Sequence, residues 1–405
     1  SSAASDVYKR QVAADTVIGN AGVSTLTVTG GGKLLSGTTT VIANLYSASG
    51  SEVTLTRLGS SLETGQLIVG NEGSARLTVE AAASATSDSA IIGRHSTSVA
   101  TVTGDGSTWV AGDLQIGGDV ADPGGASGNG TLNVTAGGKV NSTAARLGTV
   151  AGATGAAIID GEGSAWTVGS GSLAIGDAGT GSLAVTGGGI VGSQAVVLGN
   201  SAASTGSARI SGVGSTLRSE GDIIVGRGGN AMMSVEAGGA VESRNGVVAA
   251  LGGSSSSVTV TGGGSSWTMT GTLIAGYQDT ASAEVTASAG GNIRAGEVVL
   301  GDLSGSSGTM TIMGASSNVT AYVDSGLGAS GRMTVGQSGS GGLTVTNGAS
   351  LNAYLFSVGS SAGSDGAVLV NGIGSRVSVG DTLVIGAAGN RRGKGTGGAA
   401  VAGPT

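Results

Sequence analysis

Short runs of residues along the chain alternate apolar with small or polar side chains. One run, Leu-Thr-Val-Thr followed by three glycines, begins at Leu26. A period of two is typical of a β-strand with one buried face, and these runs are too short for helices. Glycine clusters between the runs allow corners with positive φ. The pattern therefore predicts short strands joined by tight turns.

The runs belong to an internal repeat. Copies of this first motif begin 50 to 58 residues apart, and a second motif, Val-Thr-x-x-Gly-Ser-x-Trp, alternates with it. A third motif, in which a glycine follows an apolar residue, lies between them, as at Val69-Gly70. The first motif begins at Leu26, Leu77, Leu132, Leu183, Met233, Val285 and Leu343, and the apolar residue of the second is Leu55, Val102, Ile159, Ile210, Val260, Ile312 and Val370.

A repeat of this length and composition predicts an all-β solenoid. We expect 14 half-repeats averaging about 26 residues, each forming one turn of a parallel β-helix whose strands stack on the next turn. Leu26 and Val28, with their equivalents, should point inward, and Thr27 and Thr29 outward. A β-propeller is the alternative, but fourteen glycine-rich units fit it poorly.

The repeat sets the expected domain boundaries. Residues 12–390 should form the β-helix. Residues 1–11 carry no repeat, and we interpret them as an artefact of translated adapter sequence or as a disordered segment. We expect residues 391–405 to form a disordered basic, glycine-rich tail. The chain has no initiator methionine and no export signal, so we expect it to be a fragment.

Three tryptophans follow the same Gly-Ser-x turn of the second motif. Leucine or valine takes that place in other copies. A position that accepts Trp, Leu and Val is typical of core packing rather than of a ligand site. The tryptophans are Trp109, Trp166 and Trp267, and the substitutes are Leu217, Val319 and Val377.

The unit at residues 163–189, GSAWTVGSGSLAIGDAGTGSLAVTGGG, resembles the repeat of bacterial autotransporter passenger domains, which is shared with some surface proteins that carry a PEP-type sorting tail. The resemblance covers nearly all of residues 15–390. It implies a right-handed parallel β-helix exported by type V secretion to the surface of a Gram-negative bacterium. Passenger domains of this kind are commonly adhesins or stalks, and a minority carry enzymatic domains.

Composition narrows the function further. The 405 residues include 83 glycines, two prolines and no cysteine, which excludes collagen, disulfide scaffolds and thiolate metal sites. A net charge of −7 and few aromatic residues argue against nucleic-acid binding. No apolar run is long enough to cross a bilayer as a helix.

Candidate chemistry is sparse, and we predict no catalytic, cofactor-binding or metal-binding residue. His95 is the only histidine, and we expect it to be an exposed loop residue. The sequence Gly-Ser-Ser-Ala-Gly at residues 359–363 matches a nucleophile elbow, but it leads into a strand rather than a helix. No P-loop is present, and no copy keeps the aspartate of a calcium-binding β-roll, so no cofactor is expected.

Two further patterns, one of aspartates and one of outward threonines, each allow a functional hypothesis. Asp113, Asp222 and Asp381 precede equivalent strands but are several turns apart, so we interpret them as turn formers rather than paired acid–base groups. Outward threonines would suit an ice or crystal lattice only if Thr-x-Thr recurred on successive turns. Bulky and charged residues interrupt the series: Thr27/Thr29, Thr54/Thr56, Thr78/Glu80, Thr101/Thr103, Asn133/Thr135, Ile158/Asp160, Ala184/Thr186 and Arg209/Ser211.

The sequence therefore predicts a non-catalytic structural or adhesive passenger segment at the cell surface. Its expected partners are cell-surface, glycan or matrix ligands, and its open solenoid edges favour self-association. One alternative is a carbohydrate-active β-helix enzyme with its site on the insertions at residues 119–129 or 321–331. The other is a purely mechanical spacer.

Overall fold

The computed structural model describes residues 9–12, 14–125, 127–324, 326, 328–396 and 400–402. The chain divides into two compact units, Ser1–Ser193 (unit 1) and Gln194–Thr405 (unit 2). Among the described residues the only helix is the short 3-10 turn η1 (Tyr46–Ala48). None of the described helices has the length and apolar character needed to span a membrane.

Fifteen strands occupy the same place in successive turns, one per turn, and we call this face of the fold the first sheet. Within each unit these strands pair in parallel with their neighbours in the next turn. In unit 1 they are β3 (Thr25–Val28), β6 (Ser51–Thr56), β8 (Ala75–Glu80), β10 (Thr97–Thr103), β13 (Asn129–Thr135), β16 (Thr154–Asp160) and β19 (Thr180–Thr186). In unit 2 they are β22 (Thr205–Ser211), β25 (Asn230–Glu236), β28 (Ser255–Thr261), β31 (Ser282–Ser288), β34 (Ser307–Met313), β39 (Ser340–Thr346), β41 (Asp365–Asn371) and β43 (Asn390–Thr396).

The rest of each turn supplies the second sheet, also parallel. In unit 1 its strands are β1 (Lys9–Val12), β2 (Thr16–Ile18), β4 (Lys33–Ser36), β5 (Thr39–Ile42), β7 (Ser61–Val69), β9 (Ser84–Ile92), β11 (Thr108–Val110), β12 (Asp113–Ile116), β14 (Lys139–Ser142), β15 (Ala144–Leu147), β17 (Ala165–Val168), β18 (Ser172–Ile175) and β20 (Ile190–Ser193). In unit 2 they are β21 (Ala195–Leu198), β23 (Thr216–Ser219), β24 (Ile223–Val225), β26 (Ala240–Ser243), β27 (Gly246–Val248), β29 (Ser266–Met269), β30 (Thr272–Ala275), β32 (Asn292–Ala295), β33 (Glu297–Leu300), β35 (Asn318–Ala321), β38 (Arg332–Val335), β40 (Ser350–Val358), β42 (Arg376–Ile385) and β44 (Ala400–Ala402).

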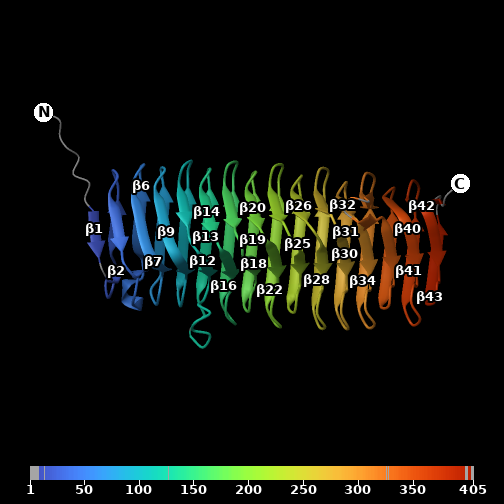
Figure 1. Ribbon diagram of the computed structural model, residues 1–405, viewed down its shortest axis with the longest axis horizontal. Helices are drawn as coiled ribbons and strands as arrows, with labels where there is room; N and C mark the ends of the chain where they lie inside the picture. The colour runs from blue at the N-terminus through green and yellow to red at the C-terminus, as the bar shows by residue number, and fades with distance from the viewer. Residues whose placement is uncertain are drawn as a thin grey trace. The chain divides into compact units, whose positions relative to one another are not determined.

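This arrangement confirms the predicted parallel β-helix. Strands such as β25 and β28 lie side by side in successive turns of unit 2 (Figure 1). Inward side chains stack on their equivalents and form buried aliphatic ladders, which remove apolar surface from water. In unit 2 one such ladder is Ile210, Val235, Val260, Ala287, Ile312, Val345 and Val370, all buried.

The two motifs form equivalent strands in successive turns, and all copies share one register. Leu55 of the second motif pairs with Val28, which is the second apolar residue of the first motif. Both side chains are buried. The expected outward series is also observed, since Thr27 pairs with Thr54 and Thr54 with Thr78. Alternation along the strand therefore identified the inner face correctly.

The tryptophan positions are core positions, as predicted. Trp109, Trp166 and Trp267 are fully buried, as are the leucine and valines that replace them. Each indole N–H donates to a serine hydroxyl of the preceding turn, at 3.4 Å for Ser87, and at 3.1 Å for both Ser142 and Ser243. A buried indole needs such a partner because an unpaired N–H in the core is costly.

The serine of the Gly-Ser-x turn links neighbouring turns. The buried Ser164 hydroxyl donates to the Asp160 carbonyl at 2.7 Å and accepts from the Gly137 N–H at 3.0 Å. Ser317 makes the same two bonds with Met313 and Gly290. This serine therefore satisfies backbone groups that the corner would otherwise leave unpaired.

The strands extend past the boundaries expected at residues 12 and 390. β1 pairs with β4, and β43 pairs in register with β41, as β44 does with β42. Backbone pairing does not depend on an apolar pattern, which explains why the Asn-Arg-Arg-Gly-Lys-Gly-Thr sequence of β43 gave no strand signal. Residues 1–8, 397–399 and 403–405 lie outside the described residues.

Candidate functional site

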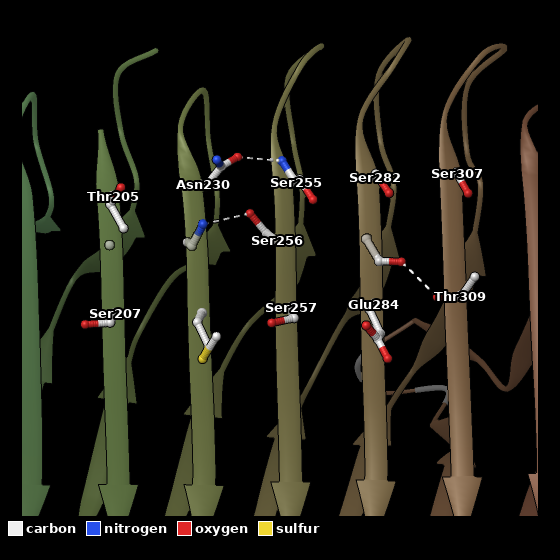
Figure 2. Close-up of a pocket in the computed structure, with 14 residues that line it drawn as sticks. Thr205, Ser207, Asn230, Ser255, Ser256, Ser257, Ser282, Glu284, Ser307 and Thr309 are labelled. Carbon is white, nitrogen blue, oxygen red and sulfur yellow. Dashed lines mark hydrogen bonds between the residues drawn. The ribbon is translucent and has the colours of Figure 1, made fainter. Parts of the chain in front are cut away.

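A groove of about 540 Å³ lies on the outward face of the first sheet in unit 2. Five consecutive strands, β22, β25, β28, β31 and β34, form its floor (Figure 2). It is lined by Thr205, Gly206, Ser207, Asn230, Ala231, Met232, Ser255, Ser256, Ser257, Ser282, Ala283, Glu284, Ser307 and Thr309. At the usual strand spacing the outer strands are about 19 Å apart, so the groove is long enough for several units of a polymer.

The register explains why the surface is hollow there. Two outward columns cross the groove, one through Thr205, Asn230 and Ser255 and the other through Ser207, Met232 and Ser257. Most of these side chains are small, so the surface stays low over five turns. A column of bulky residues would fill the same space.

The groove combines polar side chains with apolar surface from Met232 and two alanines. In the described part of the chain, the hydroxyls of Ser255, Ser282 and Ser307 form no side-chain hydrogen bond, and no cation lies within 4.0 Å of the Glu284 carboxylate. Met232 lies between Ser207 and Ser257 in its column and is 60% exposed. Hydroxyls, a carboxylate acceptor and an exposed thioether suit a ligand with both hydroxyl groups and C–H faces.

Some lining groups are already engaged within the protein. The Asn230 side chain accepts from the Ser255 N–H at 3.0 Å, and Thr309 donates to the Ala283 carbonyl at 3.2 Å. The Ser256 hydroxyl accepts from the Ala231 N–H at 3.0 Å. These bonds fix the lining without occupying the free hydroxyls, so the surface is preorganised.

Sequence reasoning missed this groove. The outward series of unit 1 is interrupted as expected, by Ile158 and Ala184. In unit 2 a more regular column follows, with Thr259, Thr286 and Thr311 on consecutive strands. The recurrence of small polar residues at the start of five consecutive copies was the signal that could have located the groove.

His95 lies in a loop, as predicted, but the prediction that it is exposed is wrong. Its side chain is only 10% exposed and lies between two carboxylates, with Nδ1 2.9 Å from Glu72 Oε1 and Nε2 3.1 Å from Asp122 Oδ2. The neighbouring Arg94 Nε lies 2.9 Å from Asp119 Oδ2. Stacking of corner loops from successive turns creates these contacts, which cannot be read from residues that are more than 20 positions apart. No set of three or more possible metal ligands occurs among the described residues.

The three aspartates lie in structural contacts. Asp113 pairs with Arg146 of the next turn at 3.1 Å, and Asp222 accepts from the Asn245 amide at 2.8 Å. Asp381 lies within β42, where Thr382 donates to it at 3.0 Å. The strand partners of Asp113, Ser89 and Ala144, bring no second carboxylate beside it.

The nucleophile-elbow match lies between two strands. Residues 359–363 connect β40 to β41, with no intervening helix, and the Ser361 hydroxyl accepts from Ser338 at 3.3 Å.

The two insertions expected from the sequence are both present. One is the loop between β12 and β13, which extends beyond its neighbours (Figure 1), and the other contains the antiparallel pair β36 (Val323–Asp324) and β37 (Ala329–Ser330).

Asp302 is a buried carboxylate in a corner loop of unit 2. Burial raises the pKa of its carboxyl, and a 2.7 Å hydrogen bond from Gln337 opposes that rise. The folded chain therefore binds this proton more readily than the unfolded chain. The ionised form destabilises the fold as pH rises through the raised pKa, and this penalty is absent below the ordinary aspartate range near pH 4.

We expect Asp302→Asn to stabilise unit 2 at neutral pH and to have a much smaller effect near pH 4. Asparagine keeps an oxygen that can accept from Gln337 but carries no charge to desolvate. Urea midpoints of the wild type and the variant at about pH 4 and about pH 7 measure the difference. An equal gain at both pH values would show that the carboxylate charge is not the cause.

Comparison with known proteins gives a similarity to a solved structure but no family. No protein-family model matches the chain, and no curated protein matches it. Among solved structures, the chain is similar to a TibC-catalysed, hyper-glycosylated fragment of TibA. The identity is 15%, the alignment covers 96% of this chain and 98% of that chain, and the TM-score is 0.48.

Proposed function

We propose that this chain is a structural and adhesive segment of a secreted bacterial surface protein, and that it acts without catalysis. The resemblance of its repeat to autotransporter passenger domains supports export by type V secretion to the exterior of a Gram-negative outer membrane. The observation that carries the adhesive role is the groove on β22–β34, a preorganised surface that presents polar side chains beside apolar ones across five turns. Its partners would be glycans of cells, matrix or other surfaces.

The periodicity of the groove favours a polymer over a small molecule. Hydroxyls lie on β22, β28, β31 and β34, and the Asn230 amide takes their place on β25, so a linear glycan lying across the strands could meet polar groups at successive units. Each bond contributes little, but several bonds along one polymer add together in the manner of linked binding sites. Adhesion by many weak contacts follows from this arrangement.

An enzymatic site on the β12–β13 loop has less support. Two carboxylates of that loop, Asp119 and Asp122, lie against Arg94 and His95. Carboxylates that already contact basic side chains are poorly placed to act as a general acid and base on a substrate. The purely mechanical spacer is the alternative that a binding experiment must exclude.

Placing a large cationic side chain in the groove should strongly reduce adhesion. Ser257 lies in the middle strand and is half-buried, so Ser257→Arg would fill the central space with a long side chain. We expect retention of protein-coated beads on polysaccharide films and cultured cells, measured under flow, to fall at least about tenfold, equivalent to roughly 1.4 kcal/mol.

Thr346→Arg is the matched control. Thr346 is also a half-buried outward residue of the first sheet, on β39, and it does not line the groove. The proposal predicts that this variant adheres as the wild type does. Equal loss in both variants would show that added charge, rather than blockage of the groove, reduces adhesion, and unchanged retention with Ser257→Arg would remove the groove from the function.

A further inference from the structure

The chain's only histidine joins three successive corner loops in unit 1. Glu72 follows β7, His95 follows β9, and Asp122 lies in the loop between β12 and β13. The His95 backbone is fixed by a 2.9 Å hydrogen bond from its N–H to the Asn71 carbonyl. The imidazole is therefore held between the underlying turn and the insertion loop.

Both ring nitrogens face a carboxylate. Nδ1 lies 2.9 Å from Glu72 Oε1, and Nε2, a buried atom, lies 3.1 Å from Asp122 Oδ2 in a charge contact not aligned as a hydrogen bond. A neutral imidazole carries one N–H and turns a lone pair towards the other carboxylate, whereas the imidazolium carries an N–H on both sides and a positive charge. The contacts on both sides are favourable only in the protonated form.

The other charged groups at this site, Arg94 and Asp119, form a separate ion pair that also holds the loop. Arg94 Nε lies 2.9 Å from Asp119 Oδ2, and Arg94 Nη1 donates a hydrogen bond to Asn71 Oδ1 at 3.3 Å. The start of the loop has further anchors, because the Val120 N–H donates to Gln115 and the Ala121 N–H to Asp119. None of these contacts depends on a histidine proton.

We propose that Glu72, His95 and Asp122 form a proton-dependent latch that holds residues 122–125 of the insertion loop against the neighbouring turns. At mildly acidic pH the imidazolium bridges the two carboxylates and the loop is closed. Loss of the proton leaves Asp122 opposite a neutral ring, and the distal part of the loop detaches while the Arg94–Asp119 pair keeps its start in place. The latch concerns unit 1 and is independent of the adhesive groove.

Hydrogen exchange tests the latch directly. Amide protection in peptides covering residues 120–125 is measured at about pH 5.5 and about pH 8, either side of the range in which histidine titrates, with correction for intrinsic exchange rates. We expect exchange in the wild type to be about two- to fivefold faster at the higher pH, as for the loss of one partly exposed ion pair. His95→Gln should exchange at the faster rate at both pH values.

Arg94→Gln is the control, because it removes the other tether. It should increase exchange at both pH values but keep the pH dependence. The single histidine also allows a second measurement, in which the ring resonance and the Asp122 amide resonance should titrate together in the wild type. A wild-type loop with equal protection at both pH values, a pH dependence that persists in His95→Gln, or an Asp122 amide that does not follow the ring would each overturn the proposal.

Discussion

Trp267→Ala is expected to lower the local free energy of unfolding by about 3–5 kcal/mol. The indole is fully buried between Val241 and Ile293 of the neighbouring turns, and its N–H donates to Ser243 at 3.1 Å. Gly246 leaves the space that the ring occupies, since a Cβ there would lie 2.5 Å from Trp267 Cζ2. Truncation would leave a cavity and an unpaired serine hydroxyl.

Repeat arrays unfold in local segments, so hydrogen exchange of β26, β29 and β32 is the suitable measurement. Trp267→Leu is the matched control, because Leu217 fills the equivalent position in another turn and is also fully buried. Its cost should be smaller, about 1–3 kcal/mol, since leucine fills more of the cavity. Equal costs for alanine and leucine would contradict the packing interpretation.

The second large effect is expected at a glycine where two turns approach closely. Gly276 follows β30 with φ of +72°, and a Cβ added there would lie 2.3 Å from the Ser307 carbonyl oxygen of the next turn. Gly276→Ala therefore combines left-handed backbone strain with a clash against backbone that is itself hydrogen-bonded. We expect a cost of about 3–5 kcal/mol, with loss of amide protection in β30 and β34.

Gly253→Ala separates these two contributions. Gly253 has a similar φ of +83°, but an added Cβ would meet no atom within 4 Å. Only the backbone strain applies, so the cost should be about 1–2 kcal/mol. If both substitutions cost the same, close approach between turns is not what requires glycine at residue 276.

The fold could be predicted because one physical rule operates in every turn. Alternation along a strand fixes which side chains are buried, and the repeat then places Leu55 over Val28 without further information. β43 escaped prediction because it pairs with β41 through its backbone while its sequence lacks an alternating apolar pattern. An alternating apolar pattern predicts which side chains are buried, but it does not by itself predict which strands pair.

The candidate sites depend on relations between turns, which the sequence does not display. His95 acquires Glu72 and Asp122 as partners through the stacking of three loops of different length. The groove requires small side chains to coincide in register over five strands, and the exposed Met232 and unpaired Glu284 to lie among them. Both features follow once the register of each turn is known.

The most direct test of the adhesive function measures binding and cleavage together. Immobilised neutral, amino-bearing and acidic polysaccharides and fixed cells are incubated with the purified chain, and retained protein and released reducing ends are determined in the same wells. We predict saturable retention on at least one surface, with reducing ends at the level of the protein-free control. Release of reducing ends that Asp119→Ala or Asp122→Ala abolishes would indicate an enzyme, and absence of retention on every surface would indicate a spacer; either result would contradict the account.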